Sequence, residues 1–142
     1  MKLNNNPENL FLYHYVEELI SDYGSYYEEN LQNPELTIKE YSVLLRIRFI
    51  GKSTQRELVE LFKVSGAYMA KLLRKFEDEN YIIRIENPEN RREKIVELTE
   101  NGIKKTNHLI ETIDAWEREV TCNLSEDEIV MLKKILSKII RR

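Results

Sequence analysis

The stretch that decides the fold is TQRELVELFKVSGAYMAKLLRKF, residues 54–76. Thr54 and Glu57 have the spacing of a capping box, which predicts a short helix that ends near Phe62. Ser65 then predicts the start of a second helix after a tight turn. Apolar residues at helical spacing predict one buried face across both helices, formed by Leu58, Leu61, Phe62, Met69, Leu72, Leu73 and Phe76. Two short helices joined in this way predict a helix-turn-helix.

The residues that the second helix leaves outside this buried face suit contact with DNA. Gly66 and Ala67 are small, so the helix backbone can approach the major groove closely, with Tyr68 beside them. The helix starts at Thr54 and Ser65 offer backbone amides and a positive dipole to phosphate. Further positive charge comes from Lys71, Arg74 and Lys75. The alternative is an ordinary solvated surface, because exposed lysines are common on any small domain.

A hairpin is predicted directly after the second helix. Residues 81–86 and 94–98 alternate as strands do, and the cluster Asn87-Pro88-Glu89-Asn90 between them is typical of a turn. The hairpin places Arg91 and Arg92 near its tip, and an arginine on a thin wing can enter a minor groove. The expected fold class is therefore mainly α, a winged helix-turn-helix with a two-stranded wing. The predicted DNA-binding residues are Thr54, Gln55, Ser65, Gly66, Ala67, Tyr68, Lys71, Arg74, Lys75, Arg91, Arg92 and Lys94.

Helical patterns occupy the rest of the chain. They predict helices over residues 8–31, 37–51 and 99–122 and a final helix from Ser125. In the second of these, the residues expected to be buried are Tyr41, Leu44, Leu45 and 47–49. The outer helices carry apolar stripes that one small lobe could not cover, so a two-fold homodimer is expected. The predicted division is an N-terminal dimerisation helix in 1–36, a DNA-binding lobe in 37–98 and C-terminal dimerisation helices in 99–142.

The composition of the 142-residue chain excludes several classes of protein. No apolar run approaches the roughly 18 residues of a membrane span, and the polar start does not resemble a signal peptide, so a soluble cytoplasmic protein is expected. The single cysteine, Cys122, excludes a disulfide framework and is expected to be a buried or half-buried inert thiol. His14 and His108 lack partners at metal-ligand spacing, so no metal or other cofactor is expected. Phosphate-loop and nucleophile-elbow motifs are missing, which argues against an enzyme.

The charge divides unevenly along the chain. Residues 39–94 hold 13 Lys/Arg and nine Asp/Glu, a net charge of +4, although the whole chain carries −3. The segments outside this range carry a net charge of −7. A cationic centre between acidic ends indicates that the centre meets an anion such as double-stranded DNA, whereas the ends avoid it.

Seven segments carry a family resemblance: LT at 36–37, STQREL at 53–58, VS at 64–65, FEDENYIIR at 76–84, NPENRR at 87–92, VELTENG at 96–102 and LSEDE at 124–128. Together they resemble the MarR (multiple antibiotic resistance) family of transcriptional regulators. The resemblance implies an obligate homodimer whose first and last helices intertwine and whose lobes each bind half of a pseudo-palindrome, usually as a repressor. The family usually has Asp where this chain has Asn90, which implies a looser wing, and Gly where it has Asn80, which Asn tolerates.

The resemblance also implies release of DNA by a small aromatic or lipophilic effector. The candidate residues for a phenolic effector are Tyr13, Tyr15 and Tyr23, whose rings carry hydroxyl tips, and Arg46, which could pair with a carboxylate. The alternative is that the tyrosines pack in the dimer interface and that Arg46 forms salt bridges or contacts phosphate.

A second function class remains open on the residues alone. A winged helix can serve as a protein–protein interaction module without DNA binding, with the outer helices for oligomerisation. The adjacent Arg91 and Arg92 argue against it, because a wing that docks on protein has no need of two arginines. Salt dependence separates the two, since DNA binding weakens steeply as salt rises.

Overall fold

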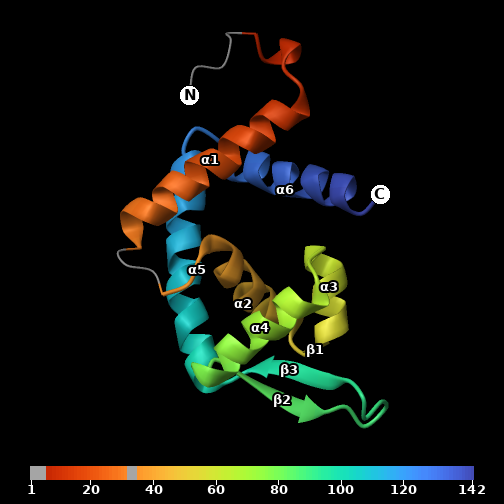
Figure 1. The fold of residues 1–142 in the computed structure, drawn as a ribbon. Coiled ribbons are helices and arrows are strands. Elements are labelled where there is room, and N and C mark those ends of the chain that lie inside the picture. The colour runs from red at the N-terminus through yellow and green to blue at the C-terminus, as the bar shows by residue number, and fades with distance from the viewer. Residues whose placement is uncertain (1–5, 32–34) are drawn as a thin grey trace.

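The computed structural model describes residues 6–31 and 35–142 of the chain. Within them, six α-helices and one small sheet confirm the mainly helical winged fold (Figure 1). A 3₁₀ turn at Pro7–Asn9 precedes the first helix, which therefore begins at Leu12 rather than at Glu8. The elements are α1 (Leu12–Asn30), α2 (Ile38–Ile50), β1 (Ser53–Thr54), α3 (Gln55–Phe62), α4 (Gly66–Asp78), β2 (Ile82–Glu86), β3 (Lys94–Leu98), α5 (Glu100–Val120) and α6 (Glu126–Ile140).

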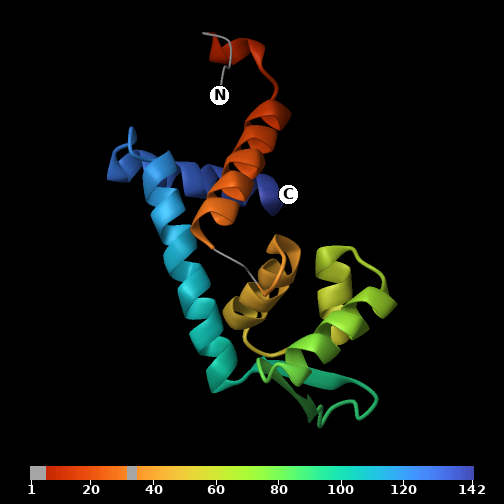
Figure 2. The ribbon, with the colours of Figure 1, turned by 60° about the vertical axis from the view of Figure 1, so that its left-hand side comes forward.

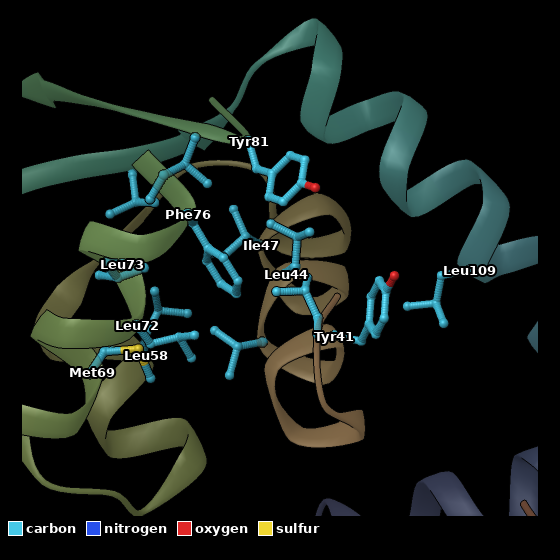
Figure 3. Packing of buried hydrophobic residues seen from close by; sticks show 14 of the residues in the cluster. Tyr41, Leu44, Ile47, Leu58, Met69, Leu72, Leu73, Phe76, Tyr81 and Leu109 are labelled. Atoms are coloured by element: carbon cyan, nitrogen blue, oxygen red, sulfur yellow. The ribbon is translucent and has the colours of Figure 1, made fainter. Parts of the chain in front are cut away.

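The lobe is built around the buried face of α4. Met69, Leu72, Leu73 and Phe76 are all buried, as their spacing predicts, and they pack against α2 and α3 (Figure 3). Each such side chain stabilises the fold by about 1.5–3 kcal/mol relative to exposure. The buried partners from the neighbouring elements are Val43, Leu44, Ile47, Leu58, Ile82 and Val96.

Two apolar residues expected in this core lie outside it. Phe49 has 70% of its surface exposed, because it lies about 200° around α2 from the buried Ile47. Leu61 has 44% exposed, because α3 is short and turns only the side centred on Leu58 toward the core. The predicted burial of these two residues was wrong.

The wing belongs to a three-stranded sheet rather than a two-stranded one. The strand order is β1-β3-β2, all antiparallel, and Ser53 pairs with Val96 while Arg84 pairs with the same residue from the other side. The two-residue strand β1 is too short to show an alternating pattern, so the sequence did not reveal it. It places the start of α3 directly against the wing.

The start of α5 lies against the loop that follows α4. Asn80 ends α4 with φ 61, and the Thr99 backbone N–H donates to the Tyr81 carbonyl oxygen at 3.0 Å. A Cβ on Gly102 would lie 2.1 Å from that same oxygen. The Leu98-Thr99-x-x-Gly102 segment is therefore a steric requirement: only glycine lets the first turn of α5 come this close.

The outer helices occupy the end of α5 far from the wing (Figures 1 and 2). α1 packs on α5 through Trp116, whose Nε1 donates to Asp22 Oδ2 at 2.8 Å and whose ring lies 5.1 Å from that of Tyr23. Lys133 pairs with Glu117 between α6 and α5. Large apolar side chains remain exposed on both outer helices: Leu12, Val16, Leu19 and Ile20 on α1, and Leu132, Ile135, Leu136 and Ile139 on α6. Among the described helices, none has the length and apolar character needed to cross a bilayer.

The different surroundings of Gly102 and Gly24 predict opposite effects of an alanine substitution on stability. Gly102→Ala is expected to lower the free energy of unfolding by about 2–4 kcal/mol, because the new methyl group must displace the Tyr81 carbonyl. Gly24→Ala in α1 meets no atom within 4 Å and is expected to raise it by about 0.5–1 kcal/mol. Urea denaturation at one fixed protein concentration checks both, and an unchanged midpoint for Gly102→Ala would contradict the close contact.

Candidate nucleic-acid interface

The first turn of α4 projects from the lobe. Ser65 caps it, and its Oγ accepts the Tyr68 backbone N–H at 3.0 Å. Gly66 and Ala67 are exposed in this turn, in line with the prediction from the apolar stripe. The first amides of a helix have no acceptor within the helix, so this turn presents both donors and a surface without bulky side chains.

Tyr68 is held from one side by a lysine that sequence reasoning did not single out. Lys39, on α2, places its Nζ 5.1 Å from the centre of the Tyr68 ring. The ring is half-buried and packs against the core, and the Lys39 cation lies next to the projecting turn. Only the fold brings these two residues together, because 29 positions separate them in the chain.

Thr54 forms the capping box that its spacing from Glu57 predicts. Its side chain is only 9% exposed, and its Oγ1 accepts the Glu57 backbone N–H at 3.2 Å. In return the Thr54 N–H donates to Glu57 Oε2 at 3.1 Å, which completes the capping box. The hydroxyl is thus engaged in the cap, at the end of the strand that pairs with β3. The predicted contact of this helix start with phosphate would come from its backbone amides and stays a prediction.

A hollow of about 490 Å³ lies between α3, α4 and the sheet. It brings together four residues of the predicted set, Gln55, Gly66, Arg92 and Lys94. A second hollow of about 370 Å³ lies along α4 beside Ala70, Lys71 and Arg74. The two hollows are adjacent and together form a cationic surface that spans from the recognition helix to the wing.

Arg84 borders both hollows and was missed at the level of sequence. It follows the buried Ile82 by two residues in β2, so it points to the same face, beneath α4. Its Nε lies 3.6 Å from Glu77 Oε2 and, among the described residues, has no hydrogen-bond acceptor. The sequence did hold one sign of this position: Arg84 lies two residues after an apolar residue of the strand, so both point to the same face of the sheet.

The wing tip has its own local hydrogen bonds. Asn90 Oδ1 accepts the Arg92 backbone N–H at 3.1 Å, so Asn90 shapes the turn rather than holding a guanidinium group. Arg91 Nε lies 3.6 Å from Glu86 Oε1, and both side chains are exposed. Within the described part of the chain no carboxylate lies within ion-pair distance of Arg92, whereas Lys94 beside it is also exposed.

Lys75 is half-exposed on α4 and forms an ion pair with α2. Its Nζ donates to Glu40 Oε2 at 2.8 Å, between α4 and α2. Burial alone would raise the pKa of Glu40, but the hydrogen bonds from Lys75 and from the Thr37 backbone outweigh it and lower that pKa overall. The predicted contact of Lys75 with DNA stays a prediction, and Lys71 and Arg74 are the more exposed cations of α4.

The four residues predicted for an effector do not share one cavity. Tyr13 is 67% exposed near the start of α1, and Tyr15 donates its hydroxyl to the Pro7 carbonyl at 3.0 Å. Tyr23 packs against Trp116, and Arg46 is exposed on α2. A hollow of about 490 Å³ lies beside Tyr15, lined also by Leu19, Asp22 and Val120.

Cys122 is exposed in the turn between α5 and α6, which corrects the expectation of a buried or half-buried thiol. The apolar neighbours Val120 and Leu124 suggested burial, but they too are exposed in the protomer. His14 Nδ1 accepts the Phe11 backbone N–H at 3.2 Å. Across residues 6–31 and 35–142, no group of three His, Cys, Asp or Glu side chains is arranged to hold a metal ion.

Comparisons with known proteins agree with this geometry. Residues 36–94 match the model of the MarR family. The chain is 31% identical to the multiple antibiotic resistance protein MarR of Salmonella typhimurium over 108 residues, which are 75% of this chain and 74% of that protein. A crystal structure of MarR superposes with a TM-score of 0.81 at 24% identity, covering 99% of this chain and 94% of that one. A mutant MarR from E. coli complexed with operator DNA superposes with a TM-score of 0.70 at 22% identity, covering 96% and 99% of the two chains.

Proposed function

Because the chain belongs to the MarR family of helix-turn-helix transcriptional regulators, we propose that two copies bind one pseudo-palindromic DNA operator. The function is binding rather than catalysis. The observation that supports the proposal best is the capped, exposed first turn of α4 beside the exposed Arg92 of the wing. The helix suits a major groove and the wing suits the minor groove next to it.

The recognition helix supplies the sequence-reading contacts in this proposal. Gly66 and Ala67 allow the α4 backbone to come near the base edges, while Tyr68 and Gln55 offer polar groups at either side. Lys71, Arg74 and Arg84 line the hollow along α4 and supply contacts to the phosphates. Phosphate contacts position the lobe, and base contacts give it specificity.

The homodimer rests on the exposed apolar faces of α1 and α6. Leu132, Ile135, Leu136 and Ile139 share one face of α6, and α1 exposes a second stripe at the same end of the molecule. A two-fold contact covers both stripes and holds two α4 helices at a separation of roughly 34–36 Å, one turn of DNA. The acidic outer segments then lie away from the duplex, which limits repulsion by phosphate.

We propose repression as the mode of regulation, because a dimer that covers an operator within a promoter blocks access to it. We also propose a small aromatic effector that releases the DNA. Its support is the hollow of about 490 Å³ on α1, which offers the Tyr15 ring, the apolar Leu19 and Val120, and polar groups from Asp22.

Removing one cation, either from the wing or from α4, is expected to weaken operator binding. Arg92→Ala and Lys71→Ala should each raise the Kd for the operator by about 10-fold. Each should also reduce the slope of log Kd against log salt concentration by about one to two, because fewer counterions are released on binding. Fluorescence anisotropy with a selected operator at several salt concentrations measures both quantities.

Lys134→Ala is the matched control, since it removes the same charge from the polar side of α6. Wild-type affinity in both wing and helix variants would contradict the assigned roles. Binding to a protein partner with little salt dependence, and none to DNA, would favour an interaction module instead.

A charge placed on the apolar face of α6 is expected to separate the protomers. Wild type should sediment as a dimer at micromolar concentration, and Leu136→Glu as a folded monomer, because the carboxylate would be buried unpaired. Lys134→Glu, on the opposite side of the helix, should remain dimeric. A wild-type monomer in sedimentation velocity would contradict the proposed dimer.

A phenolic effector is expected to raise the operator Kd of wild type in the same anisotropy assay. Ser25→Trp, which fills the hollow beside Tyr15 from the side of α1 opposite its apolar stripe, should abolish that response and leave DNA binding without effector unchanged. Unaltered release in Ser25→Trp would place the effector elsewhere.

A further inference from the structure

Four side chains meet at the base of α5, and the interface described above uses none of them. Lys105 Nζ donates to Glu35 Oε2 at 3.1 Å, and the Tyr81 hydroxyl donates to the same oxygen at 3.0 Å. The Lys105 ammonium also lies 5.9 Å from the centre of the Tyr41 ring and 5.8 Å from that of Tyr81. Both tyrosines are buried, and a cation over a desolvated ring is held more strongly than one at an exposed site.

We refer to Glu35, Tyr41, Tyr81 and Lys105 as the Lys105 cluster. Its members come from three parts of the fold: Glu35 precedes α2, Tyr81 follows α4, and Lys105 belongs to α5. Figure 3 shows the hydroxyl groups of Tyr41 and Tyr81 directed toward α5. The cluster therefore joins α5 to the DNA-binding lobe.

The charges of the cluster stabilise each other. The hydrogen bonds from Lys105 and then from Tyr81 hold the pKa of the Glu35 carboxyl below its usual value. Partial burial opposes the charge on Lys105, but Glu35 and the two tyrosines outweigh it and leave the Lys105 pKa raised. Both groups are charged at neutral pH.

Tyr81 connects this cluster to the recognition helix. It is the third residue after α4, its carbonyl accepts the Thr99 N–H at 3.0 Å, and its hydroxyl is engaged by Glu35. Rotation of α4 relative to α5 must therefore disturb Tyr81. On the other flank of α5, Arg48 donates to the Ile103 carbonyl and to Thr106 Oγ1 at 3.0 and 2.9 Å. With the Lys105 cluster lost, the start of α5 keeps the Thr99–Tyr81 hydrogen bond and the Arg48 contacts, but the next turn of α5 loses its link to Glu35 and to the two tyrosine rings. The lobe then gains freedom to turn about the start of α5.

We propose that Lys105 is a positioning residue that fixes the angle between the DNA-binding lobe and α5, and thereby the half-site spacing that the dimer accepts. The role in half-site spacing rests on the proposed function, because only a dimer on two half-sites has a spacing. The role in fixing the angle concerns one chain alone and can be measured without DNA.

Spin labels on one chain measure the angle between lobe and arm directly. Glu60→Cys on α3 and Glu111→Cys on α5 are exposed labelling sites, and Cys122→Ser removes the native thiol. Dilution with an excess of unlabelled chains leaves only the distance within a chain for double electron–electron resonance.

Lys105→Met keeps the aliphatic stem and loses the charge, so its distance distribution is expected to broaden about twofold relative to wild type. Lys105→Arg keeps the cation and should restore the wild-type width. Lys104→Met is the matched control, because that side chain is 73% exposed and pairs only with Glu100, at 3.9 Å, among the described residues. Equal widths for Lys105→Met and Lys104→Met would overturn the proposal. Glu35→Gln, at an exposed site, replaces Lys105→Met if the latter does not fold and should broaden the distribution likewise.

Operator duplexes with one base pair added or removed between half-sites test the consequence for DNA. Wild type should discriminate against both duplexes, and Lys105→Met should lose about fivefold of that discrimination, whereas Lys104→Met keeps it. Unchanged discrimination in Lys105→Met would overturn the spacing role. A wild-type protein that binds no duplex would contradict the proposed function, and the spin-label widths would then decide the role of Lys105 by themselves.

Discussion

The approach of the α5 backbone to the Tyr81 carbonyl is the contact on which the other elements depend. Gly102 permits this approach because it has no Cβ, and the Thr99 N–H donates a hydrogen bond to the Tyr81 carbonyl at 3.0 Å. Through this contact the end of α4, the sheet and α5 meet at one junction. An arm that connects two lobes can set a distance between recognition helices only if each lobe is held at such a junction.

The cations of the lobe and of α5 include two groups with different roles. Lys75, Arg48 and Lys105 are bound to carboxylate or carbonyl groups and hold elements together. Lys71, Arg74 and Arg92 remain exposed on one face. A chain with a formal net charge of −3 can therefore present a cationic surface to DNA, because the position of the charges and not their sum decides what that surface binds.

Local signals predicted most of the fold. The capping residues Thr37, Thr54, Ser65, Thr99 and Ser125 all begin helices as expected, because a cap involves only neighbouring residues. Contacts distant in sequence were not predictable in the same way. The partner of Lys75 lies 35 positions away, and Arg84 enters the interface only because β2 passes beneath α4. Strand β1 is defined by pairing with β3 and by nothing in its own two residues.

Selection of bound duplexes from a random DNA pool tests most directly whether two copies present their recognition helices to one duplex. Two inverted half-sites with centres about 10 base pairs apart are the result expected of a two-fold dimer with α4 in successive major grooves. Enrichment of a single asymmetric half-site bound by one chain, or no enrichment at all, would contradict it.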